Sequence, residues 1–143
     1  MNDYILGIDN RNVDYKYRIR LPKFIGVKVG DKLVLIYRKD FLEVKEFQNY
    51  VKELNNYREF INKAENKETY EFYQEKMNEI TSCISSFIEV KDEFGRINLK
   101  RETVERYKFN EGTTIEGTVD GIRIWNIHKF EEYQNKHLKS GRK

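Results

Sequence analysis

Asp14-Tyr-Lys-Tyr-Arg18-Ile-Arg-Leu21 and, in the second half of the chain, Asp92-Glu-Phe-Gly-Arg96-Ile-Asn-Leu99 are two copies of one motif. The aspartate, the arginine, the isoleucine and the leucine recur at the same spacing in both copies. A motif that repeats within one chain indicates a duplicated structural unit, because similar sequence builds the same local structure each time. We therefore expect a fold with two related halves.

The similarity continues downstream of both copies. Leu42-Glu-Val44 matches Ile122-Arg-Ile124, and Phe47-x-x-Tyr50 matches Phe130-x-x-Tyr133. The offset between the matching positions grows slightly along the chain, as small loop insertions would cause. The same order of turn, strand and aromatic pair in both halves argues against a chance match.

Each copy of the motif predicts a tight turn followed by a half-buried strand. An aspartate side chain caps such a turn, and Gly95 supplies a positive φ. Tyr17 stands at the position of Gly95 in the first copy, so we expect there either a strained positive φ or a different turn. The alternation after the turn directs one set of side chains outward (Arg18, Arg20, Arg96 and Asn98) and another into the core (Ile19, Leu21, Ile97 and Leu99).

The remaining pattern predicts a mainly β protein with helices, of the α+β class. Pro22 should end the first strand, whereas Lys100 stands at that place after the second copy, which leaves open whether the second strand runs on. Further strands are expected at 32–37, 41–45, 113–119 and 122–126. An apolar period of about 3.6 residues predicts helices near 46–63 and 67–83, with Asn66 as a cap between them, and a shorter helix at about 128–136. The expected plan is a first half at 1–50, a helical connector at 51–86, a second half at 87–135 and a basic tail at 136–143.

The composition limits the class of protein. Of the 143 residues 38% are hydrophobic and 36% are charged, but 14% are aromatic, and each aromatic side chain buries a large area in a core. The single cysteine, Cys83, excludes an intramolecular disulfide. The chain begins Met-Asn-Asp and has no long apolar segment, so we expect a cytoplasmic protein.

Little in the sequence indicates catalysis. The two histidines, His128 and His137, lie near the end of the chain with no cysteine beside them. The sequence has no phosphate loop, no glycine-rich dinucleotide fingerprint and no metal-ligand spacing. A catalytic pair of Cys83 and His128 is an alternative that the apolar neighbours of Cys83 disfavour. We therefore expect no enzyme, no cofactor and no metal.

Positive charge is concentrated in three segments. Residues 11–23 hold five basic residues and one acidic residue, and residues 96–108 hold five basic and two acidic residues. The stretch 136–143 adds Lys136, Lys139, Arg142 and Lys143 without an acid, whereas residues 52–80 hold five basic and seven acidic residues. Segregated positive charge attracts a polyanion such as DNA, with an affinity that falls as salt rises.

With these motifs the chain resembles the MraZ family, within the wider AbrB-like swapped-hairpin fold. The first match is Leu6-Gly7 followed after a short spacer by Asp14-x-x-x-Arg18-x-x-Leu21-Pro22. The second is Glu89-Val-Lys-Asp92-x-x-Gly95-Arg96-Ile97, and the third is Ile122-x-Ile124-Trp125 followed by Phe130-x-x-Tyr133. The resemblance implies two swapped-hairpin β-barrel halves bridged by the helical hairpin.

The resemblance also implies a transcriptional regulator associated with the nucleoid. Such a protein forms a ring-like homo-oligomer larger than a dimer and binds double-stranded DNA at short direct repeats upstream of its own cell-division and cell-wall operon. The DNA-facing motif corresponds to residues 14–18 and 92–96, in which Asp14, Asp92 and Gly95 shape the turns. With the neighbouring cations, the expected DNA-binding residues are Lys16, Arg18, Arg20, Lys23, Arg96, Lys100 and Arg101.

Other interpretations compete with this one. Arg18 and Arg96 could serve only to pair with the aspartate four residues earlier, and the surrounding lysines could be an ordinary solvated surface. Trp125 is expected in the core or an interface, and the aromatic stripe of the helices against the barrel. The competing function is a divergent relative that acts as a protein-interaction or assembly module, which Tyr17 and Lys100 favour.

Overall fold

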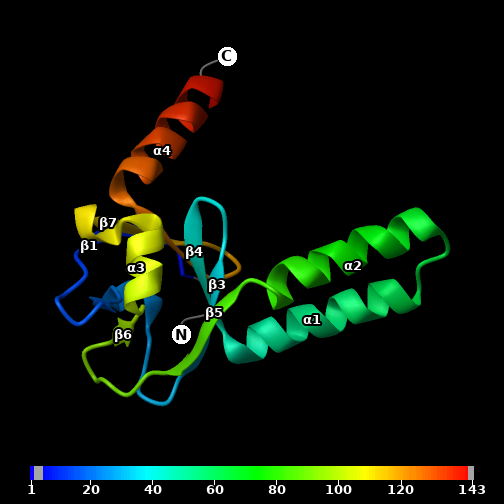
Figure 1. The fold of residues 1–143 in the computed structure, drawn as a ribbon, viewed down its shortest axis with the longest axis horizontal. Helices are drawn as coiled ribbons and strands as arrows, with labels where there is room; N and C mark the ends of the chain where they lie inside the picture. Colours follow the sequence, from blue (N-terminus) through cyan, green and yellow to red (C-terminus); the bar gives the residue numbers. More distant parts are fainter. Residues whose placement is uncertain (2–4, 142–143) are drawn as a thin grey trace.

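A computed structural model describes residue 1 and residues 5–141 of the chain, with side chains described as far as residue 138 (Figure 1). The protein is α+β, as expected. The strands are β1 (Gly7–Arg11), β2 (Arg18–Arg20), β3 (Lys32–Tyr37), β4 (Phe41–Glu46), β5 (Ile84–Glu89), β6 (Arg96–Asn98), β7 (Thr113–Gly117) and β8 (Ile122–Asn126). The helices are α1 (Phe47–Asn62), α2 (Lys67–Thr81), α3 (Arg101–Tyr107) and α4 (Ile127–Gly141), with short 3-10 helices at Lys23–Ile25 and Phe109–Glu111.

Six strands form one antiparallel sheet in the order β1-β7-β8-β4-β3-β5. By position in the two halves, β1 corresponds to β5, β3 to β7 and β4 to β8, and exchanging these partners leaves the strand order unchanged. β1 from the first half pairs with β7 of the second, and β5 from the second half pairs with β3 of the first. Each half therefore supplies an edge strand to the other.

The two repeated motifs meet in a separate two-stranded sheet. β2 and β6 pair antiparallel, with Ile19 opposite Ile97 at the centre. Arg18 lies opposite Asn98, and Arg20 lies opposite Arg96. We call these strands and the turns before them, residues 14–20 and 92–98, the β2–β6 ribbon. The repeat found in the sequence is thus also a contact in space.

The main core includes the inner face of the ribbon and one face of the six-stranded sheet. The four motif residues expected in the core, Ile19, Leu21, Ile97 and Leu99, are each at most 4% exposed, which confirms the predicted alternation. They belong to the same cluster as Leu35, Val44, Ile115 and Ile124 from the sheet. The ribbon is therefore anchored through its isoleucines, and its arginines are left on the outer face.

A second, smaller cluster covers part of the other face of the sheet. Val34 and Ile36 of β3 pack there against Tyr50 of α1 and Ile80 of α2. Beyond that contact the α1–α2 hairpin extends away from the sheet (Figure 1), and its far end is held by rings of its own, such as Phe60 stacked on Tyr73. The expectation that the whole aromatic stripe packs against the barrel is wrong for this far end, where Tyr70 is exposed and Tyr57 lies against Tyr73 of the neighbouring helix.

Several predicted boundaries agree with the structure, and others differ. The strands at 32–37 and 122–126 are confirmed, and Asn66 caps α2 by accepting a hydrogen bond from the amide of Thr69 at 2.8 Å. The second helix was predicted to 83, with Ile84 on its apolar stripe, but α2 ends at Thr81 and Ile84 begins β5. α4 continues to Gly141 instead of ending near 136, so part of the basic tail is helical, while Arg142 and Lys143 lie outside the described residues.

Because the halves exchange strands, we expect neither residues 1–64 nor residues 65–143 to fold cooperatively alone. Each fragment would lack an edge strand and one half of the ribbon, and so would leave apolar surface exposed. Thermal unfolding followed by circular dichroism measures this, and an equimolar mixture of the two fragments serves as the control that should regain a transition. A cooperative transition in either fragment alone would contradict the shared core.

Candidate nucleic-acid interface

Both turns of the ribbon are built in the same way. In the first, Asp14 Oδ1 accepts hydrogen bonds from the amides of Lys16 and Arg18, both at 2.9 Å, and the amide of Tyr17 donates to the Asp14 carbonyl at 3.0 Å. In the second, Asp92 Oδ1 accepts from the amide of Phe94 at 2.8 Å, and the amide of Gly95 donates to the Asp92 carbonyl at 3.0 Å. The capping role expected for the two aspartates is therefore confirmed.

Tyr17 adopts the conformation that its position demands. Its φ is 63°, close to the 74° of Gly95, so the first turn has the strained positive φ and not a different shape. A left-handed conformation costs a non-glycine residue about 1–2 kcal/mol. The bulky residue therefore strains the first turn without changing how it presents Arg18.

Each motif arginine is held by its own aspartate. Arg18 Nε donates to Asp14 Oδ2 at 2.9 Å, and Arg96 Nε makes the same bond to Asp92 Oδ2. Among the described residues, the terminal nitrogens of the two guanidinium groups have no hydrogen-bond partner in the protein. The ion pairs expected under the structural interpretation are thus present, and they leave the outer edge of each guanidinium able to bind a ligand.

The pKa values of both aspartates are lowered from the ordinary value of an aspartate. Partial loss of hydration opposes the shift of Asp14, but backbone hydrogen bonds from Arg18 and Lys16 and the bond to the Arg18 side chain outweigh it and lower the Asp14 pKa. The Asp92 pKa is lowered first by the amide of Phe94 and then by Arg96, with a further contribution from the charge of Arg18. Since Arg18 comes from the other copy, the two motifs share one electrostatic environment.

The remaining predicted DNA-binding residues, Lys16, Arg20, Lys23, Lys100 and Arg101, are all exposed. Arg20 belongs to the ribbon, Lys16 lies over the ring of Tyr15 at the first turn, and Lys23 begins a 3-10 helix after β2. Arg101 pairs with Glu105 at 2.8 Å on α3, which weakens its case as a free cation.

Lys100 alters the segment after the second strand and leaves the strand itself unchanged. β6 ends at Asn98 and has three residues, as β2 does. Lys100 has a φ of 68° and precedes α3, in the place where the first copy has Pro22 and only a single 3-10 turn. The second strand therefore does not run on past the end of its repeat.

One residue of the ribbon was missed by the sequence interpretation. Phe94, at the tip of the second turn, is 54% exposed. The guanidinium carbons of Arg20 and Arg96 lie 5.7 and 5.6 Å from the centre of its ring, within the range of a cation–π contact. An aromatic residue beside a repeated arginine is a weak signal, because only the β2–β6 register shows that Arg20 comes to the same ring.

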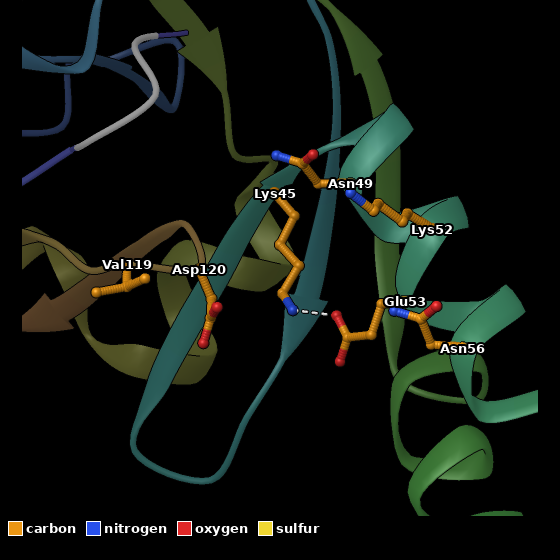
Figure 2. Close-up of a pocket in the computed structure, with 7 residues that line it drawn as sticks. All are labelled: Lys45, Asn49, Lys52, Glu53, Asn56, Val119 and Asp120. Carbon is orange, nitrogen blue, oxygen red and sulfur yellow. Dashed lines mark hydrogen bonds and ion pairs between the residues drawn. The ribbon is translucent and has the colours of Figure 1, made fainter. Parts of the chain in front are cut away.

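A pocket of about 430 Å³ lies between α1 and the β7–β8 turn (Figure 2). Lys45 is buried in it and its Nζ pairs with Glu53 of α1, while Asp120 faces the pocket from the turn. The two lysines of the lining, Lys45 and Lys52, are matched by the two carboxylates. Because its charges balance internally, this pocket has no evident preference for an ion of either sign.

The described part of the chain shows no grouping of His, Cys, Asp or Glu residues that could hold a metal ion, and no helix long and apolar enough to span a membrane. Cys83 is exposed just before β5, and Trp125 is buried against Phe41, Phe130 and Tyr133, as a core residue. The β2–β6 ribbon is therefore the candidate site. No protein-family model matches the chain, and a search of the curated proteins found no match to it.

Proposed function

We propose that the chain is a sequence-specific DNA-binding transcriptional regulator of the MraZ type. The observation that carries the proposal is the ribbon: two Asp-x-x-x-Arg turns from opposite halves of the chain lie in one small sheet. Their isoleucines are buried and their arginines project outward, each held at Nε by an aspartate. A paired, outward-facing arginine motif suits a polyanion better than a small metabolite.

The strand exchange supports the finer assignment of the fold. In a swapped-hairpin arrangement two equivalent halves interleave, which agrees with a strand order that is unchanged by exchanging them. The central β4–β8 pairing has the same symmetry, because Leu42 lies opposite Ile124 and Val44 opposite Ile122. We infer that the chain is a fused pair of AbrB-like halves.

In the proposed mechanism the ribbon binds in the major groove, which admits a two-stranded β-ribbon. Arg18 is suited to a base edge, because a guanidinium fixed at Nε offers its two terminal nitrogens in one plane. Other exposed cations, Lys16, Lys23 and Lys100, would contact phosphates and set the position on the duplex. Phosphate contacts supply affinity, and the base contact of Arg18 supplies specificity.

We expect the protein to be an oligomer larger than a dimer. Binding to consecutive DNA repeats is weak for a single ribbon, and joint engagement by several subunits raises the overall affinity. Exposed aromatic residues away from the ribbon, such as Phe47 and Phe87, offer surface that subunit contacts would bury. Light scattering at micromolar concentration measures the state, and a stable monomer would contradict this model.

Footprinting on the DNA upstream of the protein's own gene tests the proposed function. A protected run of short direct repeats is expected, with an affinity above that for a random duplex of equal length. Binding to both should weaken as salt rises, the random duplex being released first. If the protein neither protects this DNA nor binds heparin or duplex in a salt-sensitive way, the assembly-module interpretation replaces the proposal.

A further inference from the structure

The two ends of the ribbon are not equivalent, although the motif is repeated. When the two copies are aligned on their aspartates, Phe94 corresponds to Lys16 and Asn98 corresponds to Arg20. The antiparallel register then places Arg20 and Arg96 together at one end, and Arg18 and Asn98 at the other. One end carries two guanidinium groups beside an aromatic ring, and the other carries one.

Arg20 and Arg96 carry the same charge and lie directly opposite each other on β2 and β6, which requires an explanation. Like charges directly opposite each other on two strands repel. Asp92 pairs with Arg96, but Arg20 has no carboxylate partner among the described residues. The ring of Phe94 is near both guanidinium groups, and its electron-rich face attracts each of them, which offsets the repulsion.

We propose that Phe94 is a positioning residue that holds Arg20 and Arg96 as a joint binding site for one phosphate of the DNA backbone. The inference rests on the proposed function and adds that the two ends of the ribbon bind DNA differently. Two arginines that are neighbours across a ribbon, of which only Arg96 pairs with a carboxylate, leave a net positive charge that a phosphate neutralises. The planar guanidinium fork matches the geometry of phosphate oxygens.

The opposite end of the ribbon lacks such a pair. Asn98 is uncharged, and its Oδ1 accepts a hydrogen bond from the amide of Lys100 at 2.8 Å, so it adds no second cation beside Arg18. Lys16, which occupies the place of Phe94, lies over Tyr15 and not between two arginines. The Phe94 end therefore makes the stronger backbone contact, and each chain binds a DNA element in one orientation.

Substituting Phe94→Leu keeps an apolar side chain of similar size and removes the ring. Each exposed cation–π contact corresponds to about two- to fivefold in affinity, so losing both should weaken binding about five- to thirtyfold on any DNA sequence. The slope of log affinity against log salt should become shallower by about one phosphate contact. Phe94→Tyr should restore both values. In an Arg20→Ala background the Phe94→Leu effect should shrink, because one of its two partners is already gone.

Tyr15→Leu is the matched control, because it removes the exposed ring at the other tip. It should change affinity by only about two- to fivefold, less than Phe94→Leu, since a single cation–π contact is lost there. Unfolding temperatures of all variants are measured alongside, so that any loss of folded protein is seen.

The outcomes separate the two proposals. A wild-type protein without salt-sensitive DNA binding overturns the proposed function. If the wild type binds and Phe94→Leu binds with the same affinity and salt slope, the phosphate site is overturned and the proposed function stands. Equal losses in Tyr15→Leu and Phe94→Leu, or a loss that only follows unfolding, would also overturn it.

Discussion

The Arg18→Ala, Arg96→Ala double variant is expected to lose specific DNA binding while it remains folded. Loss of the base contact of Arg18 costs about 1–3 kcal/mol per engaged copy. Loss of Arg96 removes a phosphate contact as well, and several subunits on one DNA multiply the loss. The fold should survive, because the backbone bonds to Asp14 and Asp92 that shape the turns do not involve the arginine side chains. Affinity for the footprinted DNA and the unfolding temperature are measured on the same protein.

Because the two ion pairs are exposed, removing them should affect DNA binding much more than stability, and the double variant can therefore separate the two roles of the arginines. The Arg18 and Arg96 side chains are 28% and 37% exposed, and ion pairs in contact with water contribute little to stability because water and salt screen them. Under the structural interpretation, binding would fall only in proportion to unfolding. Lys16→Ala and Lys100→Ala are the internal controls: as phosphate contacts, they should weaken binding to all sequences alike. A folded double variant with normal DNA binding would refute the site.

The largest effect on stability is expected for Ile19→Ala. Ile19 is fully buried at the centre of the ribbon, opposite Ile97, and joins the ribbon to the main core. Truncating a buried isoleucine costs about 2–5 kcal/mol, a large part of the roughly 5–15 kcal/mol that stabilises a typical domain. Urea unfolding measures the loss, which should appear as a lower midpoint with an unchanged slope.

Ile8→Ala is the matched control for this prediction. Ile8 is an isoleucine of strand β1 that is 55% exposed, so its truncation should change the free energy of unfolding by less than about 0.5 kcal/mol. If the two substitutions had equal effects, the ribbon would not be anchored through Ile19.

The sequence predicted the elements with strong local patterns and missed those that depend on distant partners. Strands β3 and β8 alternate or run apolar between clear turns, and both were located correctly. β1 has the sequence Gly-Ile-Asp-Asn-Arg, whose only apolar side chain is exposed, and it is a strand because β7 lies beside it. Ile84 follows Ile80 at helical spacing, which hid the start of β5. α3 is only seven residues long, too short to show a helical period.

The candidate site also has one part that local sequence predicted and one part that it did not. The two arginine turns were found because their spacing is local and repeated, and the outward direction of Arg18 and Arg20 followed from alternation. That the two turns would pair with each other, and that Phe94 would gather arginines from both, depends on the register between strands far apart in the sequence. No local pattern contains that information.

The exchange of edge strands also sets the order in which the chain can fold during synthesis. Gly7 of β1 pairs with Gly117 of β7, so the first strand leaves the ribosome long before its partner has been made. At a synthesis rate of about 5–20 residues per second, β1 remains without its pairing strand for about 5–20 s. An unpaired strand invites contacts with other nascent chains, and charged side chains discourage them. Asp9 and Arg11, which form an ion pair in the folded protein, place charges on this strand and make it a poor template for aggregation.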